Sequence, residues 1–303
     1  MTDIPHNQTT TAGAFRADDL PPDRSREALR YLLRDKKAVF GAVVLSVLIV
    51  SALLAPWIVP YDPEAMDFGM MEGISWAHPL GTDDLGRDLL SRLIYGARIS
   101  LLVGFSTVAI SLVIGVILGV AAGYFGGITD MVIMRYIDLQ WAFPNFIIAV
   151  YLVAVIGQGL LNVIIAISLA FIDDFARIVR GMVLSIREEQ YVDAAKSLGY
   201  SDARIMFRHI LPNTVAPIIV QATVSVSYAI LGEAGLSFLG LGVDSDTFSW
   251  GLILADSRSF ISSAWWLGVF PGCFIMITVL SINFLGDALR DMLDVREVKS
   301  VGV

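Results

Sequence analysis

Histidine, cysteine and clustered acidic residues are the side chains best able to do chemistry, and this chain scatters them. His6, His78 and His209 are its three histidines and lie far apart, while Cys273 is the single cysteine. The single cysteine excludes an intramolecular disulfide. The separated histidines provide no set of metal ligands. No grouped nucleophile and base accompany them, so we expect no catalytic residue, no metal and no cofactor bound by this chain.

A different pattern occupies the charged segment 187–213, which lies between two apolar runs. Two stripes in it have the i, i+3, i+4, i+7 spacing of one helix face. The first is Tyr191, Ala194, Ala195 and Leu198, and the second is Ala203, Met206, Phe207 and Ile210. Gly199 fits a helix stop between the stripes, and Pro212 should end the second helix. Either the stripes pack on the protein's own helices, or one docks into a groove on a soluble partner.

The elements that must position this segment are long and apolar. Of 303 residues, 56% are hydrophobic and 17% are charged, against about 45–50% and about 25% in an average soluble domain. Five uncharged runs, 38–59, 99–129, 139–172, 210–232 and 259–286, reach the roughly 20 residues that span a bilayer. With a break at Gly157–Gly159, we expect six spans near 38–60, 97–123, 131–156, 160–178, 214–238 and 264–286. The fold class predicted is an all-α polytopic membrane protein.

The positive charges predict the orientation. With the N-terminus in the cytoplasm, 17 of the 21 Lys and Arg residues lie on the cytoplasmic side, as the positive-inside rule requires. We therefore expect both termini in the cytoplasm, with the first span an uncleaved anchor behind a disordered tail, 1–23. The net charge of −8 argues against a nucleic-acid partner, since phosphates demand a basic face.

The segment 187–213 also resembles a family signature. Asp193-Ala194-Ala195, Gly199 and His209-Ile210-Leu211-Pro212 are similar to the EAA loop of inner-membrane permease subunits of binding-protein-dependent ABC importers. Asp193 replaces the usual glutamate, and His209 stands where many families have isoleucine. Segments 81–98, 233–242 and 283–291 resemble further blocks of C-type permeases in the dipeptide/oligopeptide/nickel branch. Residues 172–174, Ile-Asp-Asp, depart from relatives, which usually carry Trp-Pro there.

The resemblance implies a type I ABC importer permease fold and a coupling helix that sits in a cleft of a cytosolic ATPase. It assigns the coupling role to Tyr191, Val192, Asp193, Ala194, Ala195, Leu198, Gly199, His209, Leu211 and Pro212. The chain has no phosphate-cradling Gly-x-x-x-x-Gly-Lys-[Ser/Thr] motif, so ATP and magnesium should bind partner subunits. The implied partners are a homologous second permease, two cytosolic ATPases, an external substrate-binding protein and the bilayer of the inner membrane.

The resemblance makes peptides the expected cargo, with nickel, glutathione or another small solute as alternatives. It divides the chain into a tail at 1–23, an N-terminal region at 24–96, a permease core at 97–290 that includes the coupling loop, and a tail at 291–303. A self-sufficient secondary transporter is a rival hypothesis. That class predicts inverted repeats and broken helices, and the sequence indicates neither.

Three residues within the spans are candidates for the translocation pathway. Glu233 places a carboxylate in lipid, at a cost of about 2.5–3.5 kcal/mol on insertion scales. It either contacts the cargo or makes a hydrogen bond that packs helices. Pro144 and Pro217 should kink their helices and so shape a passage, because proline removes a backbone donor. Asp173 and Arg177, four residues apart, are expected to pair.

Two external segments complete the expectations. Residues 61–98 and 240–263 lie between predicted spans, and the first carries several acidic side chains beside Arg87, Arg92 and Arg98. Either these segments form a docking surface for the substrate-binding protein, or they are solvated loops that lead into the next span.

Overall fold

The structure is a computed structural model, and it describes residues 33–244 and 246–300. The predicted tail 1–23 therefore lies outside the described residues. Within them, helices form nearly all of the regular structure, and the single β-bridge joins Thr82 to Asp88. The all-α fold class is confirmed.

The helices follow one another with short connections, apart from a long loop between α3 and α4. In chain order they are α2 (Lys36–Leu53), α3 (Ala55–Ile58), α4 (Leu89–Phe125), α5 (Gly127–Trp141), α6 (Asn145–Ile156), α7 (Leu160–Ala170), α8 (Ile172–Ile186), α9 (Gln190–Ser197), α10 (Asp202–Ile205), the π-helix η2 (Met206–Ile210), α11 (Leu211–Phe238), α12 (Trp250–Asp256), the 3-10 helix η3 (Ser257–Ser259) and α13 (Trp266–Ser300).

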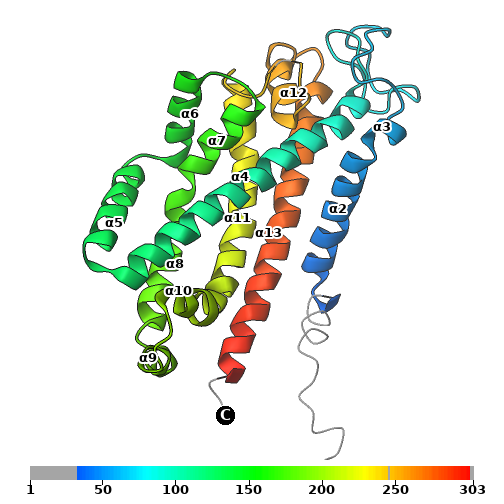
Figure 1. Cartoon of the computed structure of the whole chain (residues 1–303). Helices are drawn as coiled ribbons and strands as arrows, with labels where there is room; N and C mark the ends of the chain where they lie inside the picture. The colour runs from blue at the N-terminus through cyan, green and yellow to red at the C-terminus, as the bar shows by residue number, and fades with distance from the viewer. Residues whose placement is uncertain (1–32, 245, 301–303) are drawn as a thin grey trace, which may run out of the picture.

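The long helices lie side by side and place the short ones at opposite ends (Figure 1). Helix α4 packs on α8 and α11, and α13 packs on both α11 and α2. Helices α9 and α10 lie at one end of the bundle, while α3, α12 and the loop before α4 lie at the other (Figure 1). Helix α2 begins, and α13 ends, at the end that carries α9 (Figure 1).

Four helical segments are long and apolar enough to span a membrane: 36–53, 89–125, 202–238 and 266–293. A fifth candidate is the pair α5 and α6, which meet at an angle of 89°. Helices α7 and α8 occupy the place of the remaining expected span, and each alone has fewer than 18 residues. The arrangement is consistent with six spans.

The third expected span, near 131–156, bends sharply at Pro144, where the sequence predicts a kink, and it consists of two separate helices. Helix α5 ends at Trp141, and α6 begins at Asn145, directly after Pro144. Proline disfavours a helical conformation in the residue before it and lacks an N–H donor, so it fits the start of a new helix. The broken helices that the sequence did not indicate are therefore present, at Pro144 and again at Phe171 between α7 and α8.

Helices α4 and α8 approach closely because glycines line their contact. A Cβ added to Gly115 would lie 2.5 Å from the Phe175 Cβ, and one added to Gly119 would lie 2.7 Å from the Val179 Cβ. Gly123 has the same relation to Val183, at 2.8 Å. The spacing of four residues puts these glycines on one helix face, where small residues let membrane helices pack backbone to backbone. This packing fixes α8, whose end carries the segment 187–213.

Candidate functional site

The segment 187–213 folds as the two-helix hairpin that its spacing predicts, but its apolar faces divide differently. On α9, Val192 and Ala195 are buried, while Tyr191 and Leu198 have exposed fractions of 42% and 73%. Ala194 is exposed as well. The prediction that Ala195 shares one face with Tyr191, Ala194 and Leu198 is therefore wrong, because Ala195 packs inward with Val192.

The buried side of the hairpin joins a small apolar core of its own. Val192, Ala195, Ile205 and Ile210 pack with Val179 and Val183 of α8 and with Ile218 of α11. Burial of this kind contributes about 25 cal/mol per Å² of apolar surface. Consequently the hairpin is held rigidly against two long helices, and the exposed apolar side of α9 faces away from the bundle.

A π-turn carries the chain from the hairpin into α11. The Leu211 N–H donates to the Met206 carbonyl, five residues back, and η2 continues without a gap into α11. This wider turn lets Ile205 and Ile210, also five apart, be fully buried together. Pro212 lies in the first turn of α11, so it starts that helix and the prediction that it ends the preceding one is wrong.

Gly199 stops α9 as predicted, and its backbone explains the need for glycine. Its φ is +76°, in the left-handed region that side chains disfavour. The Tyr200 N–H donates to the Ala195 carbonyl at 3.1 Å, and the Gly199 N–H donates to the Lys196 carbonyl at 2.9 Å. Together these bonds form a Schellman motif, which satisfies the last carbonyls of the helix.

Polar bonds fasten the hairpin to the rest of the bundle. The Tyr124 hydroxyl at the end of α4 donates to the Asp202 carboxylate at 2.6 Å. The Arg187 guanidinium donates to the Gly123 carbonyl at 2.9 Å, and the Asn213 amide donates to the Tyr191 hydroxyl at 3.2 Å. The hairpin is thus connected to α4, α8 and α11, so a displacement of α9 would be transmitted to all three.

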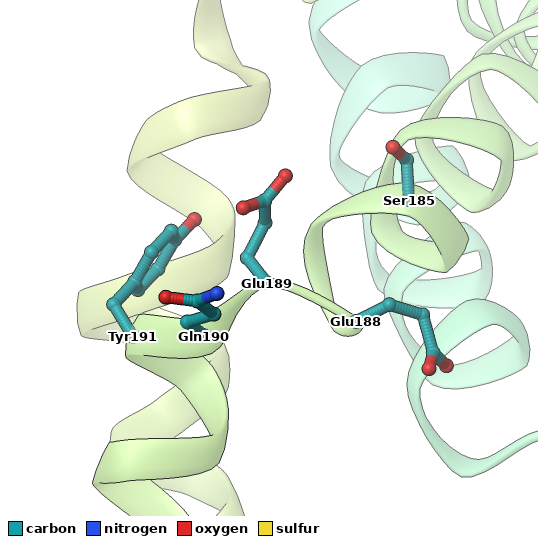
Figure 2. A pocket seen from close by; sticks show the side chains of 5 residues that line it. All are labelled: Ser185, Glu188, Glu189, Gln190 and Tyr191. Atoms are coloured by element: carbon teal, nitrogen blue, oxygen red, sulfur yellow. The ribbon is translucent and has the colours of Figure 1, made fainter.

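A hollow of about 580 Å³ lies where α8 turns into α9, lined by Ser185, Glu188, Glu189, Gln190 and Tyr191. Figure 2 shows Glu189 between Tyr191 on one side and Ser185 on the other, while Glu188 points away from them. Burial raises the pKa of the Tyr191 phenol, and the nearby Glu189 carboxylate raises it further. Tyr191 is therefore a neutral hydrogen-bonding group at physiological pH, at the edge of an acidic hollow.

The remaining predicted residues of the loop have different environments. Asp193 is exposed and bonded to Lys196 at 3.2 Å. The His209 ring stacks on Tyr200 with centroids 5.9 Å apart, and Leu211 is partly buried at the start of α11. Among the predicted coupling residues, those exposed are Tyr191, Asp193, Ala194, Leu198, Gly199 and Pro212. Phe207 of η2 has an exposed fraction of 71%.

Glu233 is not at a surface. Its side chain is fully buried in α11, and one carboxylate oxygen accepts a 2.9 Å hydrogen bond from the Ser237 hydroxyl. Helix α12 packs directly against it, since a Cβ added to Gly251 would lie 3.2 Å from that oxygen. This environment favours the helix-packing interpretation over contact with cargo. Pro217, the other α11 candidate, lies inside the helix and is exposed.

The expected pairing of Asp173 with Arg177 is wrong. Arg177 instead donates to the Asp138 carboxylate of α5 at 2.6 Å and lies 4.3 Å over the Trp141 ring. Asp173 accepts a 3.3 Å bond from the Gln140 amide, and its second oxygen has no partner. The sequence could not reveal this exchange, because Asp138 is 39 residues away and comes near only through the packing of α5 on α8.

The loop at the opposite end is organised by two buried aspartates. Asp83 pairs with Arg87 at 2.7 Å and also with Arg92 of α4. Asp88 caps α4 through the Ser91 N–H at 2.8 Å and contacts the His78 ring nitrogen at 2.9 Å. These bonds give the segment 81–92 a fixed shape, unlike a simple solvated linker.

The described residues contain no group of three or more His, Cys, Asp or Glu side chains that could hold a metal ion.

Comparison with solved structures defines the class of the fold. A chain of the inward-facing MetNI methionine ABC transporter superposes with a TM-score of 0.56 at 19% identity, covering 67% of this chain and 97% of that one. This chain therefore has the fold of that ABC-transporter chain.

Sequence comparisons then identify the family. Residues 115–299 match the family described as binding-protein-dependent transport system inner membrane component, and residues 24–78 match the N-terminal TM domain of oligopeptide transport permease C. The Dipeptide transport system permease protein DppC of Alkalihalophilus pseudofirmus is 46% identical over 89% of both chains. The Glutathione transport system permease protein GsiD of Pectobacterium atrosepticum is 42% identical over 89% of this chain and 90% of its own length.

The chain belongs to the family of binding-protein-dependent transport system inner membrane components. The family that the sequence resembles, the permease subunits of binding-protein-dependent ABC importers, is confirmed.

Proposed function

We propose that this chain is one of two permease subunits of an ABC importer that carries di- or oligopeptides across the inner membrane. The identity of 46% to a dipeptide permease, over nearly the whole of both chains, supports a peptide cargo. An alternative cargo is glutathione, itself a short peptide in chemical class, which the similarity of 42% to a glutathione permease favours.

The observation that carries the coupling role is the exposed apolar side of α9. Tyr191, Ala194 and Leu198 lie on the outward face of a helix whose inward face is locked into the bundle. Apolar side chains exposed on a rigid cytosolic helix fit a groove in a partner protein. In this proposal the groove belongs to a cytosolic ATPase. The polar side chains at the rim of that groove would contact the acidic hollow beside Tyr191.

Within the coupling segment the residues have separate roles. Val192 and Ala195 hold the hairpin on α8 and α11, and the His209 ring stacks on Tyr200 within it. Gly199 sets the turn between its helices, Leu211 and Pro212 start α11, and Asp193 stays on the accessible side. The ATPases bind ATP and magnesium, and their closure would draw two such hairpins together. Because the hairpin is connected to α4, α8 and α11, these helices would then rock between inward-open and outward-open states.

The membrane orientation belongs to the same proposal. The start of α2, the end of α13 and α9 lie at one end of the bundle (Figure 1), in agreement with cytoplasmic termini and a cytoplasmic coupling loop. The opposite end carries the segments 61–98 and 240–263. Their fixed shape around Asp83 and Asp88 suits a docking surface for the external substrate-binding protein.

A paired substitution at Leu198 tests the coupling. Leu198→Glu places a charge on the exposed face without disturbing the buried one, so it should reduce peptide-stimulated ATP hydrolysis by at least about tenfold in a reconstituted complex, as loss of an interface anchor does. Leu198→Met keeps an apolar side chain and should retain activity. A Leu198→Glu complex that hydrolyses ATP and transports peptide at the original rate would refute the assignment.

A further inference from the structure

A second hollow opens on the side of the bundle, beside two helix breaks. Its volume is about 400 Å³, within the range of small-ligand sites. Its main lining residues are Asn145 and Phe146 of α6, Phe171 and Asp174 at the break between α7 and α8, and Tyr228 and Leu231 of α11. Asp174 lies in the first turn of α8, directly after the break at Phe171.

The walls of this hollow are apolar and aromatic, with one charged group. Phe146, Phe171 and Tyr228 contribute rings, and Tyr228 and Phe146 have exposed fractions of 60% and 40%. Asp174 is the only ionisable carboxylate among the lining residues. Such a combination, an apolar site with a single carboxylate, recognises an apolar body that carries one positive charge.

The carboxylate of Asp174 has no hydrogen-bond or ion-pair partner among the described residues. The basic side chain one turn further along α8, Arg177, acts on Asp174 through its charge. Its terminal nitrogen is bonded to Asp138 at 2.6 Å, its guanidinium is stacked over Trp141, and its Nε has no hydrogen-bond partner among the described residues. The neighbouring Asp173 adds a second, fully buried carboxylate. Its Oδ2 has no hydrogen-bond partner among the described residues. Asp138, Asp173 and Asp174 thus share the single positive charge of Arg177, and a cation would neutralise the excess negative charge.

We propose that this hollow is a cargo site, in which Asp174 binds the protonated amino group of a small peptide and the three aromatic rings hold its first side chain. The proposal rests on the proposed function, and it adds the chemical class of the group that is recognised. It also predicts that the carrier favours cargo with a free amino group. The second permease would cover the open side of the hollow, since Tyr228 and Phe146 remain exposed in the single chain.

The test uses the complete complex with its loaded binding protein in proteoliposomes, and di-alanine as the probe. Asp174→Asn removes the charge with almost no change in shape, so it should reduce uptake by at least about tenfold, as loss of a charged partner does. The variant should still assemble, and ATP hydrolysis stimulated by the binding protein should persist. Asp174→Glu retains the charge and should restore at least part of the uptake. Asp287→Asn, an exposed aspartate at the far end of α13, is the matched control and should transport normally.

The outcomes separate this proposal from the proposed function. Uptake by Asp174→Asn at the original rate overturns the cargo site, while the original complex still transports peptide. Failure of Asp174→Asn to co-purify with the second permease also overturns it, because the carboxylate would then serve the contact between subunits. A complete original complex that takes up no peptide overturns the proposed function itself.

Discussion

At the scale of single residues, the two unusual acidic groups of the membrane region have opposite surroundings. Glu233 is sealed between α11 and α12, and one of its oxygens accepts a 2.9 Å bond from Ser237 while the other has no hydrogen-bond partner among the described residues. Asp174 lines a hollow and makes no hydrogen bond within the part of the chain that the structure describes. A sequence offers no means to rank them, since both acidic residues follow long uncharged runs. Burial and partners decide, and they point to packing for Glu233 and to ligand recognition for Asp174.

The packing role of Glu233 makes a specific prediction. Glu233→Gln keeps an oxygen that can accept the hydrogen bond from the Ser237 hydroxyl. Because that buried hydroxyl then keeps its partner, transport should stay within about twofold of the original. Glu233→Ala loses the acceptor and leaves a void, and it should lower the melting temperature of the complex in detergent. Transport assays and thermal scans of both variants check this. A Glu233→Gln complex that is folded but inactive would instead place Glu233 in the pathway with Pro144 and Pro217.

At the scale of helices, the glycine face of α4 determines where α8 lies, and with it the coupling hairpin. Gly115, Gly119 and Gly123 are spaced by four residues, a pattern visible in the sequence and missed by reasoning that counted only apolar length. Each glycine lets the backbone of α8 approach to a distance that a side chain forbids. Because the two helices are in close contact, a displacement of α8 is passed directly to α4.

Gly119→Leu tests this contact. The new side chain would collide with Val179 and with the Ala176 carbonyl, both 2.7 Å from an added Cβ, so the helices must separate and the yield of folded complex should fall sharply. Gly181→Leu on the outer side of α8 meets nothing within 4 Å and serves as the control. The measurement is the monodisperse fraction in size-exclusion chromatography. Equal yields of the two variants would show that the α4–α8 contact is dispensable.

At the scale of the whole molecule, the hairpin and the hollow are connected by the same helices. Helix α8 begins beside Asp174 and ends beside Tyr191, and α11 passes both sites. A movement of the hairpin therefore reaches the cargo hollow along rigid elements, without a flexible link. This arrangement suits a subunit whose energy source is outside the chain.

The predicted orientation can be measured with single cysteines, because Cys273 is the only native one. After Cys273→Ser, we expect Ser262→Cys to react with a membrane-impermeant maleimide in intact cells, since Ser262 is exposed at the external end. Ser201→Cys, exposed in the coupling hairpin, should react only after the membrane is opened. Reaction of Ser201→Cys in intact cells would reverse the orientation.

The sequence by itself determined the class of the protein, the positions of its long helices and the two-helix hairpin in the segment 187–213. These features depend on local patterns: apolar length, the spacing of one helix face, and a glycine that must adopt positive φ at residue 199. Such patterns act over a few turns of helix and need no knowledge of neighbours.

The tertiary structure alone decided the partners of the charged residues and the direction of each apolar face. Arg177 turned to Asp138 because α5 breaks from α6 and packs on α8. Ala195 is buried because it packs against apolar side chains of α8 and α11. Asp174 lines a hollow because two helix breaks lie beside each other there. Electrostatic pairing and burial depend on distances between segments that are remote in the chain, and only the packing of the helices sets those distances.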